Sequence, residues 1–131
     1  MSDVPDIHVL IYVHDEHFRK KLNSFLSMEK FHVHECKSEE EVIQFVDSER
    51  QIDVAVIDIL PSENTGFRCL EYVKSNRNTV EAVMLNNHDQ IHLSIHGMRL
   101  GAFDEIMFPF DMKRLKEKIL KAYYFGQETQ R

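Results

Sequence analysis

Short apolar runs alternate with segments of helical periodicity along most of the chain. The apolar runs predict five β-strands, at residues 7–13, 31–36, 53–57, 81–85 and 103–108. In the segments between and after them, apolar residues recur at helical spacing, which predicts helices over residues 16–29, 38–46, 66–75, 89–100 and 111–124. The third run is apolar almost throughout and is typical of a strand buried on both faces, whereas the second run alternates as an edge strand does.

Polar residues and a glycine mark several ends of these helices. Ser38, with Glu41 three residues later, is the signature of a capping box and predicts that a helix begins there. Gly101 predicts the end of the fourth helix, because glycine readily adopts the left-handed conformation that closes many helices. Asp111 is a good N-cap for the fifth helix. The final residues, 126–131, are predicted to be frayed.

Strands that alternate with helices predict βαβ units and a parallel sheet. Right-handed crossovers then give an α/β fold, a doubly wound five-stranded parallel sheet with helices on both faces. The chain of 131 residues suits one domain, which we expect to span residues 1–125, with 126–131 as a tail or the start of a linker. The sequence contains neither GxGxxG nor GxxxxGK, which argues against a dinucleotide-binding or NTPase fold.

Composition and charge narrow the class of protein further. The formal net charge of −6 argues against a nucleic-acid-binding surface. No apolar run reaches the length of about 18 residues that a membrane span requires, and the polar, acidic start does not resemble a secretory signal. We therefore expect a cytoplasmic protein without a membrane partner. In such a compartment the two cysteines are expected to be buried thiols rather than a disulfide.

Acidic residues follow two of the predicted strands. Asp58 ends the buried third strand, and Asp15 follows the first strand. In a flavodoxin-like strand order, 2-1-3-4-5, these strand ends flank the crevice where such sheets bind ligands. Two carboxylates roughly 4 Å apart repel by about 4 kcal/mol at an effective dielectric constant of about 20, and Mg²⁺ would remove that cost. The alternative, two separately solvated loop acids, stays open on spacing alone.

Four segments at strand ends carry a resemblance to a known family. They are VHDE (13–16), VIDILPSENTG (56–66), with a glycine eight residues after the aspartate, VMLNNHD (83–89) and LGAFDEIMFPF (100–110). Over about residues 7–123 the chain resembles a response-regulator receiver domain, the CheY-like family of two-component signalling. The family is not enzymatic in its role, and its members pass a signal to an output domain or partner protein.

The resemblance assigns roles to particular residues. It implies that Asp58 accepts a phosphoryl group from a histidine kinase or another phosphodonor. It implies weak Mg²⁺ binding by Asp15, by Asp58 and by the backbone carbonyl of Leu60. His14 falls on the first position of the family's acidic pair and is a further candidate ligand. The resemblance also implies a cis peptide bond between Phe108 and Pro109.

The chain departs from the family at three switch positions. Asn86 stands where the family has serine or threonine, Phe108 where it has lysine, and Glu105 where it usually has an aromatic residue. Asn86 can still donate through its amide, but Phe108 cannot pair with phosphoryl oxygens. Two functions therefore compete: a phosphoacceptor receiver, and a pseudo-receiver that binds or dimerises without phosphorylation. A small enzyme using His14 and Asp58 as acid and base is a weaker third hypothesis.

Eight histidines are present, and six of them suggest sites. His88, His92 and His96 would form one stripe if the fourth helix began early enough, and His32 and His34 share one face of the predicted edge strand. Each set could bind zinc or nickel, or could simply be a solvated face. His14 could bind a softer metal, pair as a cation with Asp58, or be a neutral side chain hydrogen-bonded to a loop.

The resemblance also implies a partner surface on the fourth helix, fifth strand and fifth helix. Its basic residues would be Arg99, Lys113, Arg114, Lys116, Lys118 and Lys121, beside Met98, and its acidic residues Asp104, Glu105 and Glu117. Mixed charge suits a two-fold contact between copies. We expect a weak homodimer that forms without phosphate and weakens with salt; a solvated, monomeric face is the alternative.

Overall fold

A five-stranded parallel sheet forms the centre of the molecule. The structure, a computed structural model, describes residues 5–60 and 64–129. The strands lie in the order β2-β1-β3-β4-β5, which confirms the predicted topology. Their bounds are β1 His8–Tyr12, β2 His32–Cys36, β3 Val54–Asp58, β4 Glu81–Asn87 and β5 Asp104–Phe108.

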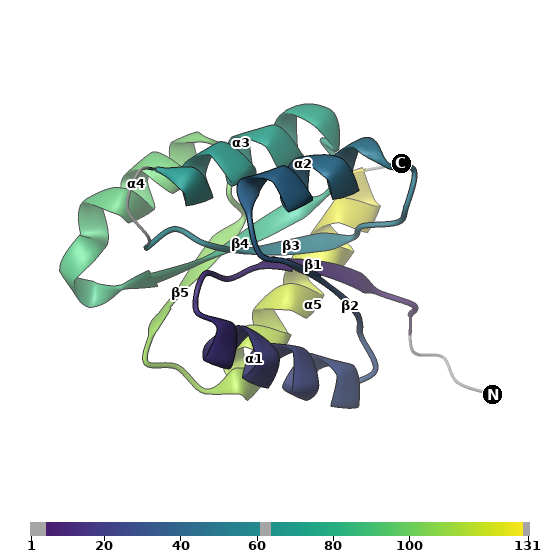
Figure 1. The fold of residues 1–131 in the computed structure, drawn as a ribbon, viewed down its shortest axis with the longest axis horizontal. Helices are drawn as coiled ribbons and strands as arrows, with labels where there is room; N and C mark the ends of the chain where they lie inside the picture. Colours follow the sequence, from purple (N-terminus) through teal and green to yellow (C-terminus); the bar gives the residue numbers. More distant parts are fainter. Residues whose placement is uncertain (1–4, 61–63, 130–131) are drawn as a thin grey trace.

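Helices cover both faces of this sheet (Figure 1). Helices α1 and α5 lie on one face, and α2, α3 and α4 lie on the other. Their bounds are α1 Glu16–Met28, α2 Glu39–Asp47, α3 Thr65–Asn76, α4 Ile91–Arg99 and α5 Met112–Thr129, with a short 3₁₀ turn η1 at His88–Gln90. The doubly wound α/β fold predicted from the alternating pattern is therefore confirmed.

Two apolar clusters fill the space between the sheet and its helices. One contains Leu10, Val42 and Leu70 and lies on the side of α2 and α3. The other contains Val9, Leu22 and Leu115 and lies on the side of α1 and α5. All five residues of β3 are buried, as expected for a central strand covered on both faces.

The predicted caps form, with one difference in detail. The Ser38 hydroxyl accepts from the backbone N–H of Glu41, but the Glu41 carboxylate accepts from the N–H of Lys37 rather than from Ser38 itself. The Asp111 carboxylate accepts from the N–H of Lys113 at the start of α5. Gly101 has φ +105° and ends α4, in agreement with the sequence.

The fifth helix is longer than its sequence pattern predicts. It runs on to Thr129 rather than ending at Tyr124, and Gly126 is buried within it. The expectation that residues 126–129 are frayed is therefore wrong. Gly126 lies close to the chain before β4, since a Cβ atom there would lie 2.9 Å from the carbonyl oxygen of Thr79.

Several smaller expectations can also be compared with the structure. Cys36 and Cys69 are buried free thiols, and burial raises the pKa of each to about 12. The peptide bond between Phe108 and Pro109 is cis. The polar loop after Asp58 includes residues 61–63, which lie outside the described residues. Within residues 5–60 and 64–129, no helix is long and apolar enough to cross a bilayer.

Candidate functional site

Asp58 is a buried carboxylate at the carboxyl end of the central strand β3. Its side chain is only 7% exposed. The chain turns away immediately after it, and the backbone N–H of Leu60 donates to Asp58 Oδ1 over 3.0 Å. The strand thus places one acid at the carboxyl end of the sheet, where parallel α/β folds bind ligands. The turn that follows fixes the orientation of the carboxylate.

The surroundings of Asp58 act on its charge in opposite directions. Burial raises the pKa of the carboxyl, because the charged form loses hydration. The backbone N–H groups of Leu60 and His14 oppose this rise, and the negative charge of Asp15 adds to it. Asp58 therefore interacts with residues that follow β1, as the predicted strand order requires.

Asp15 lies on the exposed loop after β1 and caps helix α1. Its Oδ2 accepts from the backbone N–H of Phe18 over 2.8 Å. Capping engages one carboxylate oxygen and leaves the other to a further partner. A buried carboxylate beside a second acid suits a hard cation such as Mg²⁺, which keeps several waters and needs few protein ligands. The carboxylates of Asp15 and Asp58 are therefore of the kind that this ion prefers.

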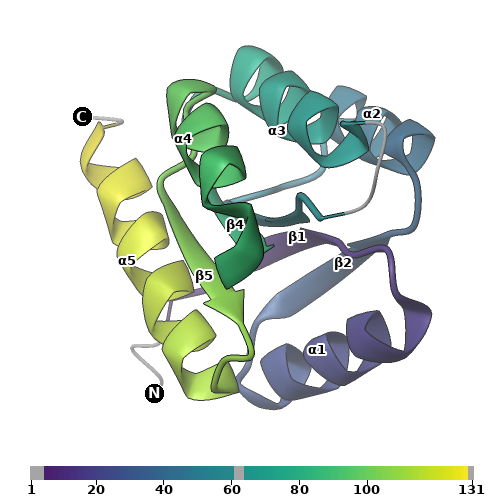
Figure 2. The ribbon, with the colours of Figure 1, turned by 90° about the vertical axis from the view of Figure 1, so that its left-hand side faces the viewer.

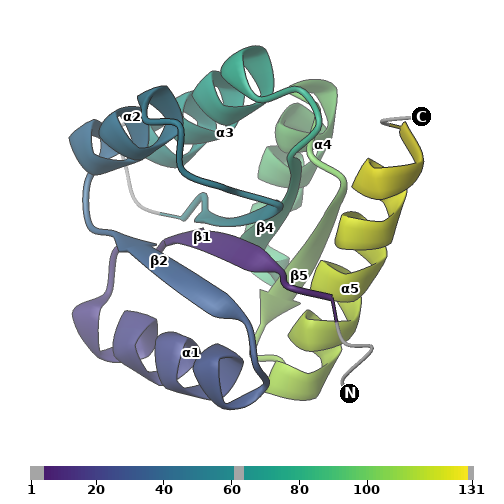
Figure 3. The ribbon, with the colours of Figure 1, turned by 90° about the vertical axis from the view of Figure 1, so that its right-hand side faces the viewer.

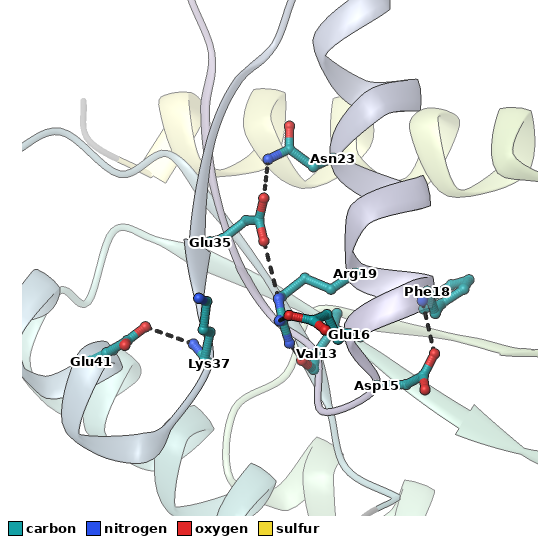
Figure 4. A network of polar contacts seen from close by, with 9 residues as sticks. All are labelled: Val13, Asp15, Glu16, Phe18, Arg19, Asn23, Glu35, Lys37 and Glu41. Atoms are coloured by element: carbon teal, nitrogen blue, oxygen red, sulfur yellow. Dashed lines mark hydrogen bonds and ion pairs between the residues drawn. The ribbon is translucent and has the colours of Figure 1, made fainter.

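A buried arginine supports the loop that carries His14 and Asp15 (Figure 4). Arg19 is 3% exposed and its Nη1 donates to the carbonyl oxygen of Val13 over 2.8 Å. Its Nε donates to Glu35 Oε1 on β2 over 3.0 Å. The guanidinium thus joins the end of β1 to the edge strand. Sequence reasoning missed Arg19, since it reads as an ordinary charged residue on a helix.

Gly66, eight residues after Asp58, packs directly on the end of β3. A Cβ atom there would lie 2.8 Å from the Cα of Ile59 and still closer to the carbonyl oxygen of Asp58. Any side chain would therefore displace the backbone that positions the Asp58 carboxylate. This close approach is the physical reason why a glycine stands eight residues after Asp58.

Asn86 is fully buried near the end of β4, and its amide hydrogens are both engaged. Nδ2 donates to the carbonyl oxygen of Gln90 over 2.9 Å and to the hydroxyl of Ser94 over 3.0 Å. Ser94 in turn donates to the carboxylate of Glu105 on β5. Asn86 Oδ1, in contrast, is a buried oxygen with no hydrogen-bond partner among the described residues. In this arrangement the amide has no proton left for a ligand at Asp58.

Phe108 belongs to an aromatic cluster, the Phe18–Phe108–Phe110 cluster. Its ring centroid lies 5.1 Å from that of Phe18 and 5.0 Å from that of Phe110. The cluster packs the start of α1 against the chain that follows β5. The position that would carry a lysine in the family is therefore occupied by a half-buried ring in apolar contact.

The structure groups the histidines differently from the prediction made from the sequence. Helix α4 begins at Ile91, so His88 lies in the preceding 3₁₀ turn and the three-histidine stripe does not form on one helix. His96 packs edge-on against Phe67. His14 is exposed, and its charge lowers the pKa of Asp58. His32 and His34 share one face of β2 as predicted, and both rings stack on His8 of β1.

The profile of the response regulator receiver domain family matches residues 9–120 of this chain. Among curated relatives, the regulatory protein AtoC of Escherichia coli (strain K12) is 22% identical over 114 residues, which covers 87% of this chain and 24% of AtoC. The heme response regulator HssR of Staphylococcus epidermidis is 26% identical over 127 residues, or 95% of this chain and 56% of HssR. The chain thus spans only part of the length of these relatives.

Solved structures agree on the fold. A CheY-like response regulator receiver domain protein from Methanospirillum hungatei JF-1 superposes with a TM-score of 0.86 at 20% identity, covering 95% of this chain and 99% of that one. NtrX from Brucella abortus, solved in complex with ATP, superposes with a TM-score of 0.85 at 21% identity and covers 94% of this chain and 28% of that one. At these identities the likeness concerns the fold.

Proposed function

Because the chain belongs to the response regulator receiver domain family, a group of non-catalytic domains of two-component signalling, we propose that Asp58 accepts a phosphoryl group. One observation carries the proposal: a buried carboxylate ends the central strand, held by a backbone N–H and influenced by Asp15 across the sheet edge. Its donor would be a histidine kinase or a small phosphodonor, in the cytoplasm where receivers usually act.

The transfer needs little chemistry from the protein beyond positioning. A carboxylate oxygen of Asp58 attacks the phosphorus, and the bond from phosphorus to the donor breaks as the new P–O bond forms. The leaving group departs with the bonding electrons. Leu60 N–H orients the carboxylate, and burial excludes water around it. These are the contributions of geometry and a fixed electrostatic setting to phosphoryl transfer.

Mg²⁺ is the cofactor that this family typically binds, and we propose the Asp15, Asp58 and Leu60 set as its ligands here. When bound, the ion neutralises charge on the carboxylates and on the phosphoryl oxygens. Asp15 is already fixed as the cap of α1, and the Arg19 contact to Val13 holds the same loop in place. The loop can thus present Asp15 without a large rearrangement.

The test is labelling with acetyl phosphate in the presence of Mg²⁺, followed by intact-protein and peptide mass spectrometry. We expect one phosphoryl group on the peptide that contains Asp58, and none in Asp58→Asn or after chelation with EDTA. Asp47→Asn on helix α2 is the control for an aspartate outside the site. An unlabelled wild-type protein under conditions that label a standard receiver would overturn the proposal.

A second function, the pseudo-receiver, is favoured by a different observation. A chain of hydrogen bonds through Asn86, Ser94 and Glu105 connects β4, α4 and β5 at the positions where the family's switch residues would stand. In that function the partner surface would be fixed in one state, and the phosphoryl acceptor would be unused. The absence of labelling, combined with partner binding by the unphosphorylated protein, is its expected result.

We propose that the partner surface lies on α4 and β5 (Figure 2). Ile91, Ile95 and Met98 are 60%, 54% and 46% exposed there, and line a groove with Glu105 and Met107. Lys118 pairs with Asp104 of the same chain over 2.8 Å, and Lys116 contacts Glu29, the residue that follows α1. The charges expected to join two copies are thus partly neutralised within one. A second copy would therefore meet an apolar surface, in a weak homodimer.

A further inference from the structure

A second group of potential metal ligands lies at the opposite end of the sheet from Asp58. Asp6 precedes β1, and His8 and His32 are directly paired neighbours at the first positions of β1 and β2 (Figure 3). One ligand atom from each of the three lies within 4.8 Å of the others. No other three His, Cys, Asp or Glu side chains come this close among the described residues.

The imidazole rings of this group are arranged in parallel. The ring of His8 stacks on that of His32, with centroids 4.5 Å apart and an interplanar angle of 13°. Nε2 of His8 lies 3.6 Å from Asp6 Oδ2, and Nε2 of His32 contacts Asp6 Oδ1. The two imidazole nitrogens and the carboxylate therefore converge on one place at the protein surface.

Neighbouring residues hold His8 in this orientation. The Asp53 carboxylate accepts from the backbone N–H of His8 over 2.8 Å. Nδ1 of His8 lies 2.9 Å from Nε2 of His34, whose own ring packs on Phe45 of α2. Metal binding requires the tautomer in which His8 Nδ1–H donates to His34, so that His8 Nε2 carries the lone pair. In that tautomer His34 Nδ1 carries the proton, and the 3.5 Å contact from Arg50 Nη2 to that atom is given up. Metal-binding histidines commonly donate their second N–H to such a partner.

We propose that Asp6, His8 and His32 bind a divalent transition-metal ion, Zn²⁺ in the first instance, with water completing the coordination. Imidazole nitrogen suits zinc, copper and nickel, whereas Mg²⁺ prefers oxygen ligands. Mg²⁺ is thus the candidate ion at the end of the sheet that carries Asp58, and Zn²⁺ is the candidate at the opposite end. Both cysteines are buried with a pKa of about 12, so neither thiol competes for zinc.

The ion would join Asp6 and the first residue of β1 to the edge strand β2. β2 has a strand neighbour on one side only, and His32 stands at its first position. A bound ion would add a bridge between these two segments beyond their backbone pairing. The same side chains lie within ion-pair distance of one another, so an ion pair between Asp6 and a protonated histidine is the competing use of this group.

The test is titration of the full chain with Zn²⁺ by isothermal calorimetry, with histidine ring signals followed by NMR. We expect one ion per chain, selective shifts of the His8 and His32 rings, and a higher melting temperature that EDTA reverses. His8→Ala and His32→Ala should each weaken affinity at least about a hundredfold, and His34→Phe only about tenfold, because it removes the supporting acceptor and not a ligand. His32 is half exposed, so its variant is expected to fold.

Three controls separate this site from others. His92→Ala, on exposed helix α4, and Asp58→Asn should both bind Zn²⁺ as the wild type does. A saturating Mg²⁺ background should not displace the zinc. Binding that survives both His8→Ala and His32→Ala, binding that is lost in His92→Ala or Asp58→Asn, or no binding to the wild-type protein would each overturn the proposal. None of these results depends on phosphorylation.

Discussion

The hydroxyl of Ser94 on α4 donates a hydrogen bond to the carboxylate of Glu105 on β5. Ser94 also accepts from Asn86, so one buried serine connects two of the positions at which this chain departs from its family. By the resemblance noted in the sequence, a serine or threonine and an aromatic residue would be expected at these positions. Here a continuous set of hydrogen bonds takes their place, and the strand β4 is tied directly to the proposed partner surface.

Removing this connection should destabilise the fold. Ser94→Ala leaves the Asn86 amide and the Glu105 carboxylate without their shared partner. An unsatisfied buried polar group costs about 1–3 kcal/mol, so we expect the free energy of unfolding to fall by about that amount in urea denaturation. Ser75→Ala, an exposed position on α3, is the control. Equal stability of Ser94→Ala and the wild type would mean that the connection contributes nothing.

Phe108→Lys should speed the labelling of Asp58. A lysine there would add a cation able to meet the phosphoryl oxygens, and the loss of one such electrostatic contact typically changes rates by about 10²–10³. The expected gain is about tenfold or more in the initial rate with acetyl phosphate, because the new side chain is not optimally placed. The same change should cost about 1 kcal/mol of stability through the lost aromatic contacts.

Phe108→Leu distinguishes charge from space in this experiment. It removes the ring from the Phe18–Phe108–Phe110 cluster and adds no cation. Its labelling rate should match that of the wild type. If Phe108→Leu is as fast as Phe108→Lys, relief of crowding rather than charge limits the reaction.

Asp58→Asn should stabilise the unphosphorylated protein at neutral pH. Burial raises the pKa of this carboxyl in the folded state, so the folded protein binds the proton more tightly than the unfolded chain does. Stability from this group is therefore present at low pH and is lost as pH rises through the folded-state pKa. Melting curves should show a gain for Asp58→Asn at pH 7 that shrinks towards pH 3. Glu71→Gln, on the exposed side of α3, should show no such trend.

Ile95→Lys should abolish self-association. It places a charge in the centre of the exposed apolar residues of α4, where a second copy would have to bury it. Sedimentation velocity at high protein concentration should show a weak dimer for the wild type and a monomer for the variant. Met28→Lys, at the end of α1 and 78% exposed, should dimerise normally. The apolar contact proposed from the structure reverses the salt dependence expected from the sequence: the dimer should persist at high salt, and its loss in salt would favour the contact between charges.

Most of the fold could be predicted from the alternation of apolar runs with segments of helical periodicity. β3 could be predicted because its apolar run needs burial on both faces, and Asp58 stood out because a carboxylate rarely ends such a run. The Ser94–Glu105 contact could not be predicted, because it depends on how α4 packs against β5, and no local sequence pattern encodes that packing. The role of His8 was missed for a similar reason: its neighbour His32 is set by the register between β1 and β2. The full length of α5 was not predicted either, because Gly126 looks like a helix end in the sequence but is buried within the helix in the structure.

The two buried thiols can report local opening of the fold without an added probe. Cys36 lies on β2 and Cys69 on α3, within one apolar cluster beneath α2 and α3. At neutral pH almost none of either thiol is ionised, so an alkylating reagent must wait until this side of the domain opens. The rate of alkylation, read by mass spectrometry at each cysteine, would therefore measure how often α2 and α3 separate from the sheet, and whether events at either end of the sheet change that frequency.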